Sequence, residues 1–169
     1  MPYFSIIIPS YNRAHIISRA IQGVLGQTFQ DFEIIIVDDG SNEATKKVLA
    51  KIKNEKLQII TQINQGSSAA RNNGIKASSA KYILVLDGDD TFNALFLEKA
   101  VAILEDNQAI GAVSSYCNLF IKNNQVVQKH LPKGEGITNF LFDNNCVSFA
   151  LIRKKCWEEI GGYDELMKN

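Results

Sequence analysis

Short runs of aliphatic and β-branched residues alternate with longer amphipathic segments along the first half of the chain. Such runs, bounded by turn residues, predict buried strands. Strands that alternate with helices form a parallel sheet covered by helices, so the pattern predicts an α/β fold with a mostly parallel sheet and helices on both faces. The predicted strands are Phe4–Ile8, Phe32–Val37, Leu57–Ile60 and Tyr82–Leu86.

Helical periodicity fills the intervals between these strands. Apolar residues recur at helical spacing between Ile16 and Leu25. Ser41 is a suitable N-cap for a second helix that runs to about Ile52, and Gly66 precedes a third. Beyond Asp90 the pattern predicts a helix over Leu95–Leu104, followed by a strand and hairpin over Ile110–Val127 with Asn123-Asn124 at the turn. A loop at Lys133–Gly136, a late strand over Val147–Ile152 and a helix that ends near Gly161-Gly162 complete the predicted order.

The acidic sequence Asp87-Gly88-Asp89-Asp90 directly follows the last of the four early strands. Open α/β sheets bind ligands at the carboxyl ends of their strands. Two carboxylates one residue apart can share a hard divalent cation there. Taken alone, the same residues are equally well explained as an acidic turn with Gly88 at the bend.

Other candidate ligand-binding side chains follow the earlier strands. Tyr11 offers an aromatic ring on which a nucleobase can stack, and Asp39 offers a hydrogen-bond acceptor for a base or a ribose hydroxyl. Arg71, on the third helix, can pair with carboxylate or phosphate oxygens. Each has a purely structural alternative: packing at the sheet edge, helix capping or a surface salt bridge. Because Tyr11, Asp39 and Asp89 leave one edge of a parallel sheet, together they predict a crevice suited to a nucleotide diphosphate.

Composition narrows the class of protein. The 169 residues predict a single domain over 1–169, and 18 basic residues balance 18 acidic ones, which argues against a nucleic-acid partner. The short run Arg153-Lys154-Lys155 predicts a solvated helix face. Cys117, Cys146 and Cys156 lack metal-ligand spacing and predict free thiols in a reducing compartment. No stretch reaches the roughly 20 apolar residues of a membrane-spanning helix.

Four motifs occur in order along the chain, and a fifth lies near its end. They are Ile6–Asn12, Ile35–Ser41, Ala70–Ile75, Tyr82–Asp90 and Ile160–Glu165. Together they resemble the motifs of the inverting, GT-A-type glycosyltransferases of family 2, over nearly the whole chain. The resemblance implies a GT-A-like, Rossmann-like fold and metal-assisted transfer of a sugar, with inversion, from a nucleotide-diphosphate donor to an acceptor hydroxyl. UDP-sugar is the expected donor, and a saccharide or lipid-linked molecule the expected acceptor.

The resemblance also implies roles for the matching residues. Tyr11 would stack on the base, Asp39 would hydrogen-bond to it, and Arg71 would hold the nucleotide. Asp89 would contact the Mn²⁺ or Mg²⁺ most directly, with the metal bridging the two phosphates of the donor. The expected nucleotide-binding residues are Pro9, Tyr11, Asn12, Asp38, Asp39, Arg71, Asp87 and Gly88, and the expected metal ligands are Asp87 and Asp89.

The family places its catalytic base in an acidic pair a short distance beyond the motif that ends at Glu165. The chain ends at Asn169 before such a pair appears. We therefore expect a single domain truncated at its C-terminal end, which binds nucleotide with weak or absent turnover. The resemblance further implies a cytoplasmic location, or the inner face of the membrane for the full-length protein, and a role in polysaccharide biosynthesis.

Two other interpretations remain open at this stage. Leu84–Thr91 also resembles the h-h-h-D-x-D-x-T motif of haloacid-dehalogenase-type phosphatases, in which Asp87 would be the nucleophile and Asp89 the general acid. That family needs a later lysine and acidic pair on further strands, whereas here several βα units precede the motif. The third interpretation is a nucleotide- or sugar-binding module without catalysis.

Overall fold

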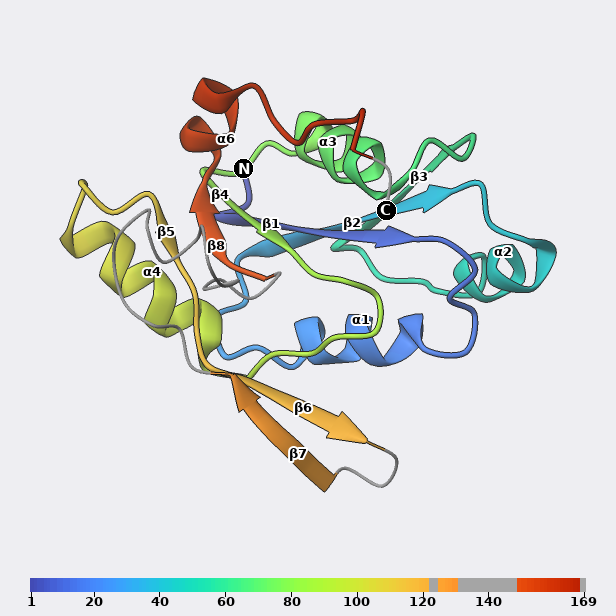
Figure 1. The fold of residues 1–169 in the computed structure, drawn as a ribbon, viewed down its shortest axis with the longest axis horizontal. Helices are drawn as coiled ribbons and strands as arrows, with labels where there is room; N and C mark the ends of the chain where they lie inside the picture. The colour runs from blue at the N-terminus through green and yellow to red at the C-terminus, as the bar shows by residue number, and fades with distance from the viewer. Residues whose placement is uncertain (122–124, 131–148, 168–169) are drawn as a thin grey trace.

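A six-stranded sheet forms the centre of the computed structural model, which describes residues 1–121, 125–130 and 149–167 (Figure 1). Its strand order is β3-β2-β1-β4-β8-β5. The strands from β3 to β4 are parallel, and β8 is antiparallel to both of its neighbours. The strands are β1 (Phe4–Ser10), β2 (Phe32–Asp39), β3 (Leu57–Gln62), β4 (Tyr82–Val85), β5 (Ala112–Val113) and β8 (Leu151–Arg153).

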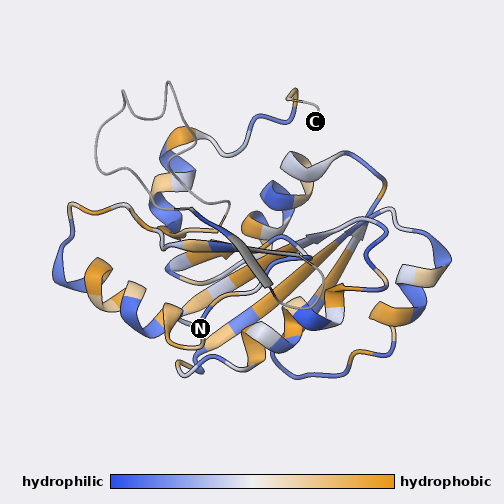
Figure 2. Cartoon of the chain, turned by 60° about the horizontal axis from the view of Figure 1, so that its bottom comes forward, coloured by the Kyte–Doolittle hydropathy of each residue, from blue (hydrophilic) through white to orange (hydrophobic). Residues whose placement is uncertain are grey.

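Helices cover both faces of this sheet, which confirms the predicted fold class. Side chains alternate between the faces of a strand, so Ile6 packs toward one set of helices and Ile7 toward the other. The strands carry mainly apolar residues between these layers (Figure 2). The first face is covered by α1 (Ile17–Leu25), α2 (Glu43–Leu49) and α4 (Phe96–Asp106), and the second by α3 (Ser67–Ala77) and α6 (Lys154–Ile160).

The α3 helix lies unusually close to the sheet at Gly74. A Cβ atom placed there would be 2.4 Å from Ile7 Cγ2 and 3.0 Å from Val37 Cγ2. Glycine is unfavourable inside a helix, but here it allows α3 to sit directly on β1 and β2. This close approach sets the height of Arg71, one turn earlier on the same helix, above the strand ends.

A polar network around Tyr82 joins α4 to β4 and β8. The buried Tyr82 hydroxyl donates to Glu105 at 2.8 Å and accepts from Arg153 Nη1 at 3.0 Å. Glu105 accepts hydrogen bonds from Lys81, Tyr3 and Tyr82, and these lower the pKa of its carboxyl to about 2, with Lys81 having the largest effect. Arg153 also donates to the Ile110 carbonyl at 2.9 Å. The prediction of a solvated basic face is therefore wrong for Arg153, which serves as an internal link.

Several predicted boundaries need correction. Asn42, not Ser41, caps α2, because its Oδ1 accepts from the Thr45 amide at 3.0 Å, and the regular helix ends at Leu49. The late strand β8 starts at Leu151, later than predicted.

The hairpin forms from β6 (Cys117–Ile121) and β7 (Gln125–His130) and projects away from the main sheet (Figure 1). The predicted turn at 123–124 and loop at 133–136 lie outside the described residues.

Two further expectations can be compared with the described part of the chain. Cys117 and Cys156 are free thiols, as predicted, while Cys146 lies outside the described residues. Within the described residues, no helix combines the length and apolar character needed to cross a bilayer.

We predict that Gly74→Ala lowers the free energy of unfolding by about 1–3 kcal/mol, because the added methyl group forces α3 away from Ile7. Urea denaturation would measure the loss. Gly26→Ala is the matched control: Gly26 has an ordinary φ of −82°, and its added Cβ would lie 3.4 Å from the Gln22 carbonyl oxygen and 3.9 Å from that of Gly23. Equal losses in the two variants would contradict the proposed close packing.

Candidate functional site

A cavity of about 830 Å³ opens at the carboxyl ends of β1, β2 and β4. The structure brings most of the predicted site residues to it, because these three strands are adjacent and parallel. The predicted residues in its lining are Pro9, Tyr11, Asp39, Arg71, Asp87, Gly88 and Asp89. Their convergence on one cavity is the arrangement that the strand pattern predicts, while the ligand remains a prediction.

Asp39 is buried, with only 4% of its surface exposed, and it is already well supplied with hydrogen bonds. Its Oδ1 accepts from the amide of Gln65 and from Gln62 Nε2, both at 2.8 Å. Its Oδ2 accepts from the Gly66 amide at 2.9 Å. A carboxylate has about four acceptor positions, so Asp39 shapes the β3–α3 loop and keeps capacity for one further donor.

Asn12 and Asp38 lie outside the cavity lining, unlike the other predicted nucleotide-binding residues. Asn12 donates its amide to Ser41 Oγ at 3.0 Å, and its Oδ1 accepts from the Asn42 amide at 2.8 Å. Asp38 accepts from the Ser41 amide at 3.1 Å. These bonds tie the exit loops of β1 and β2 together. Asn12 has a φ of +56°, a conformation that asparagine tolerates better than most residues.

Two arginines face the two carboxylates of the D-x-D sequence. Arg71 Nη2 lies 2.8 Å from Asp87 Oδ1, and Arg13 Nη1 lies 3.5 Å from Asp89 Oδ2. Both carboxylates are partly exposed. The cavity rim thus offers cationic groups for a phosphate and anionic groups for a metal ion.

The donor set of Asp87 and Asp89 fits a hard divalent cation. Magnesium is usually held by one or two carboxylates together with water and substrate phosphates. Among the described residues, no group of three or more His, Cys, Asp or Glu side chains could hold a metal ion alone. The pair therefore suits a cation that is completed by a ligand.

Some lining residues have no counterpart in the sequence predictions. Ser10 is buried, and its Oγ has no hydrogen-bond partner, so it is a polar atom at the cavity that a ligand could satisfy. Tyr11 beside it is 52% exposed. Glu165 and Met167 reach the cavity from the far end of the chain, which no local pattern could indicate. The other unpredicted lining residues are Arg13, Asn64, Gln65, Gly66, Ser67, Ser68 and Ala70.

A second cavity, of about 620 Å³, lies on the other side of Asp89. Asp89 lines both cavities. The second is lined by aromatic and polar side chains, which include Phe92, Tyr116 and Asn118. A molecule bound there would therefore lie next to a ligand of the first cavity.

Comparison with known families identifies the chain. The family model for "Glycosyl transferase family 2" matches residues 5–161. The chain belongs to glycosyltransferase family 2. This membership favours the glycosyltransferase interpretation of the D-x-D sequence over the phosphatase one, because the match extends over nearly all the βα units that surround it.

Curated relatives are longer than this chain. It is 42% identical over 113 residues to an uncharacterized glycosyltransferase of Rickettsia bellii, covering 66% of this chain and 16% of the relative. It is 31% identical over 153 residues to the Escherichia coli UDP-Glc:alpha-D-GlcNAc-diphosphoundecaprenol beta-1,3-glucosyltransferase WfgD, covering 88% and 60%. The match thus covers less than two thirds of the length of each of these two relatives.

Solved structures share the fold. Residues 1–349 of Staphylococcus aureus TarS in complex with UDP match with a TM-score of 0.81 and 23% identity, over 100% of this chain and 52% of that one. The mannosyltransferase PcManGT of Pyrobaculum calidifontis, in complex with GDP-Man and Mn²⁺, matches with a TM-score of 0.73 and 18% identity, over 98% and 48%. Both confirm the GT-A-like architecture.

We predict that Asp39→Asn destabilises the protein by about 1–3 kcal/mol, because an amide nitrogen would face N–H donors of the β3–α3 loop. Asp38→Asn should cost less, since its Oδ1 can still accept from Ser41. Urea denaturation of the two variants would compare them, and hydrogen exchange at Gly66 would locate the change. Equal losses would contradict the role of Asp39 as the loop anchor.

Proposed function

We propose that the chain binds a nucleotide-diphosphate sugar, with UDP-sugar as the expected donor, and forms the donor-binding part of a glycosyltransferase. The observation that carries this proposal is the single cavity on which Asp39, the last residue of β2, and the Asp87–Asp89 pair, after β4, converge from opposite sides of β1. The cavity therefore combines a hydrogen-bond acceptor for a nucleobase, Asp39, with two carboxylates, Asp87 and Asp89, for a cation bound to phosphate.

Individual side chains have complementary tasks in this proposal. The exposed ring of Tyr11 stacks on the base beside Pro9, and the remaining acceptor position of Asp39 takes a base N–H. Arg71, which is held by Asp87, supplies positive charge to the phosphates. Asn12 and Asp38 act indirectly by fixing the loops that carry Tyr11 and Asp39.

Asp87 and Asp89 are the residues that would hold Mn²⁺ or Mg²⁺. When bound, the cation would stabilise the negative charge that develops on the nucleotide leaving group. The protein side of this arrangement depends on Arg71 and Arg13, which pair with the two carboxylates at the cavity and hold them in place.

The acceptor hydroxyl would attack the anomeric carbon with inversion and give its proton to a carboxylate. We place the approach of a saccharide or lipid-linked acceptor at the second cavity, since Asp89 separates it from the first. The family resemblance places the base after the motif that ends at Glu165, so we assign no base within this chain. For the whole protein we propose polysaccharide biosynthesis at the cytoplasmic side of the membrane.

Several similarities support the proposal. The name of WfgD includes UDP-Glc, and TarS was solved with UDP and with UDP-GlcNAc. PcManGT was solved with GDP-Man and Mn²⁺. A nucleotide-diphosphate sugar with a divalent cation is therefore the ligand class to test first.

We predict that UDP binds this chain in a calorimetric titration, and that Mn²⁺ strengthens binding. Asp89→Asn should weaken the Mn²⁺-dependent part about tenfold or more, because one anionic ligand of the cation is lost. Asp106→Asn, an exposed carboxylate at the end of α4, is the matched control.

No binding of UDP by folded wild-type protein, with or without Mn²⁺, would remove the proposal. Binding that is unaffected by Mn²⁺ and by Asp89→Asn would leave the nucleotide site but overturn the metal ligands assigned to it.

A further inference from the structure

The chain that follows α6 packs against Trp157 of that helix and against α3, which covers the second face of the sheet. Gly161 ends the helix with a φ of +82°, and the Gly162 amide donates to the Trp157 carbonyl at 3.1 Å. A Cβ atom on Gly162 would be 3.0 Å from Trp157 Cζ2 and 2.9 Å from Asn72 Oδ1. Gly162 is therefore enclosed between an indole ring and a helix side chain, which no larger residue would allow.

Asn72 on α3 holds this segment through three hydrogen bonds. Its Nδ2 donates to the Tyr163 carbonyl at 2.9 Å and to Glu165 Oε1 at 2.7 Å. Its Oδ1 accepts from the Tyr163 amide at 2.9 Å. The backbone of Tyr163 needs both a donor and an acceptor, so the orientation of the Asn72 amide is fixed. Asn72 is only 3% exposed, and water cannot readily replace these bonds.

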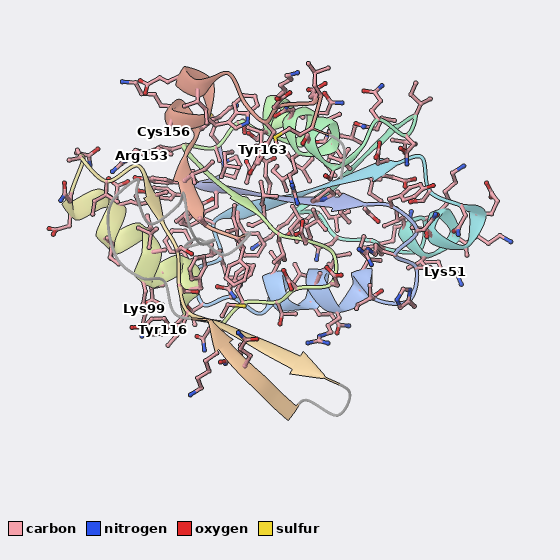
Figure 3. The ribbon with its side chains drawn as sticks, in the orientation of Figure 1. Lys51, Lys99, Tyr116, Arg153, Cys156 and Tyr163 are labelled. Carbon is pink, nitrogen blue, oxygen red and sulfur yellow. The ribbon has the colours of Figure 1, made fainter. Side chains whose placement is uncertain are left out.

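These bonds connect the end of the chain to the cavity. Tyr163 lies between α6 and α3 (Figure 3), with its ring centroid 5.6 Å from the Arg71 guanidinium carbon. Arg71 in turn pairs with Asp87. Glu165, held by Asn72, lines the same cavity. The segment Gly161–Glu165 thus runs from the end of α6 to the cavity, whose lining it reaches at Glu165, and we call it the C-terminal wall.

The charge of Glu165 restricts what it can contact. A carboxylate repels phosphate oxygens, whereas it accepts hydrogen bonds from hydroxyl groups. One Glu165 oxygen is occupied by Asn72, which leaves the other oxygen for a ligand. A nucleotide sugar presents hydroxyl groups on its ribose and on its sugar.

We propose that Asn72 is a positioning residue that holds the C-terminal wall against the cavity, so that Glu165 accepts a hydrogen bond from a ligand hydroxyl group. The ligand part of this inference rests on the proposed function, and the part about the wall does not. Asn72 itself touches no ligand, and it acts through Tyr163 and Glu165.

Trp157 is the only tryptophan of the chain and reports directly on the wall that covers it. In Asn72→Asp, a carboxylate would face the Tyr163 carbonyl and Glu165, so the wall should detach. We expect Trp157 emission to shift to longer wavelength and acrylamide quenching to rise. Asn54→Asp adds the same charge at an exposed site and keeps its acceptor for the Lys56 amide, so it should change neither signal.

A swapped pair tests the bond between Asn72 and Glu165 itself. In the double variant Asn72→Asp with Glu165→Gln, the glutamine amide can donate to the new carboxylate, which reverses the direction of the original bond. We expect the double variant to recover part of the Trp157 signal that Asn72→Asp loses. A general loss of packing would not be rescued in this way, so an absence of rescue counts against the proposed contact.

Titration with UDP-glucose and with UDP, in the presence of Mn²⁺, tests the ligand contact. We expect Asn72→Asp and Glu165→Ala each to weaken UDP-glucose binding about tenfold. Glu165 is exposed, so Glu165→Ala should fold and keep the wild-type Trp157 emission even where Asn72→Asp does not fold. A loss for UDP-glucose alone assigns the hydroxyl to the sugar, and an equal loss for UDP assigns it to the ribose.

Unchanged Trp157 emission in folded Asn72→Asp would overturn the positioning role, and unchanged affinity in Glu165→Ala would overturn the ligand contact. If the wild-type chain binds neither UDP nor UDP-glucose, the proposed function and the Glu165 contact fail together. The fluorescence comparison would still decide whether Asn72 holds the wall.

Discussion

The parallel pairing of β1 with β2 on one side and β4 on the other is the constraint on which the site depends. Ser10 is in register with Asp38, and Ile7 with Val85. Parallel strands end at the same edge of the sheet, so the loops that carry Tyr11, Asp39 and Asp87 emerge together. Backbone hydrogen bonding between the parallel strands therefore places the cavity at this edge of the sheet, whether or not a ligand is bound.

Buried polar side chains turn this edge into a defined surface. Asp39 binds the β3–α3 loop and Asn72 holds the C-terminal wall, while the exposed Asn12 joins the exit loops of β1 and β2. Leaving a buried polar group without its partner destabilises the folded state by more than a typical hydrogen bond contributes, so Asp39 and Asn72 each select one loop conformation. The same bonds that stabilise the fold thus set the shape of the cavity.

The charged side chains at the cavity form arginine–aspartate pairs, and a ligand can contact the two members of each pair with different groups. Arg71 and Arg13 face Asp87 and Asp89 at 2.8 and 3.5 Å. A diphosphate favours the arginines, and a divalent cation favours the carboxylates, so a ligand that brings both can satisfy all four side chains. Partly exposed ion pairs contribute little to stability in themselves. Their separation on ligand binding would therefore cost little free energy.

Sequence alone determined the parts of this protein that depend on local pattern. The buried runs that became β1, β2 and β4, the helical intervals and the acidic ends of the strands follow from hydrophobic periodicity, and parallel topology then predicted that Tyr11, Asp39 and Asp89 would meet. Tertiary structure decided what depends on distant neighbours. Asn42 caps α2 in place of Ser41, because Ser41 Oγ accepts a hydrogen bond from the Asn12 amide instead. Arg153 joins a hydrogen-bond network with Tyr82. Tertiary structure also joined Asn72 to Tyr163, 91 positions along the chain, because a hydrogen bond between remote segments leaves no periodic trace in either one.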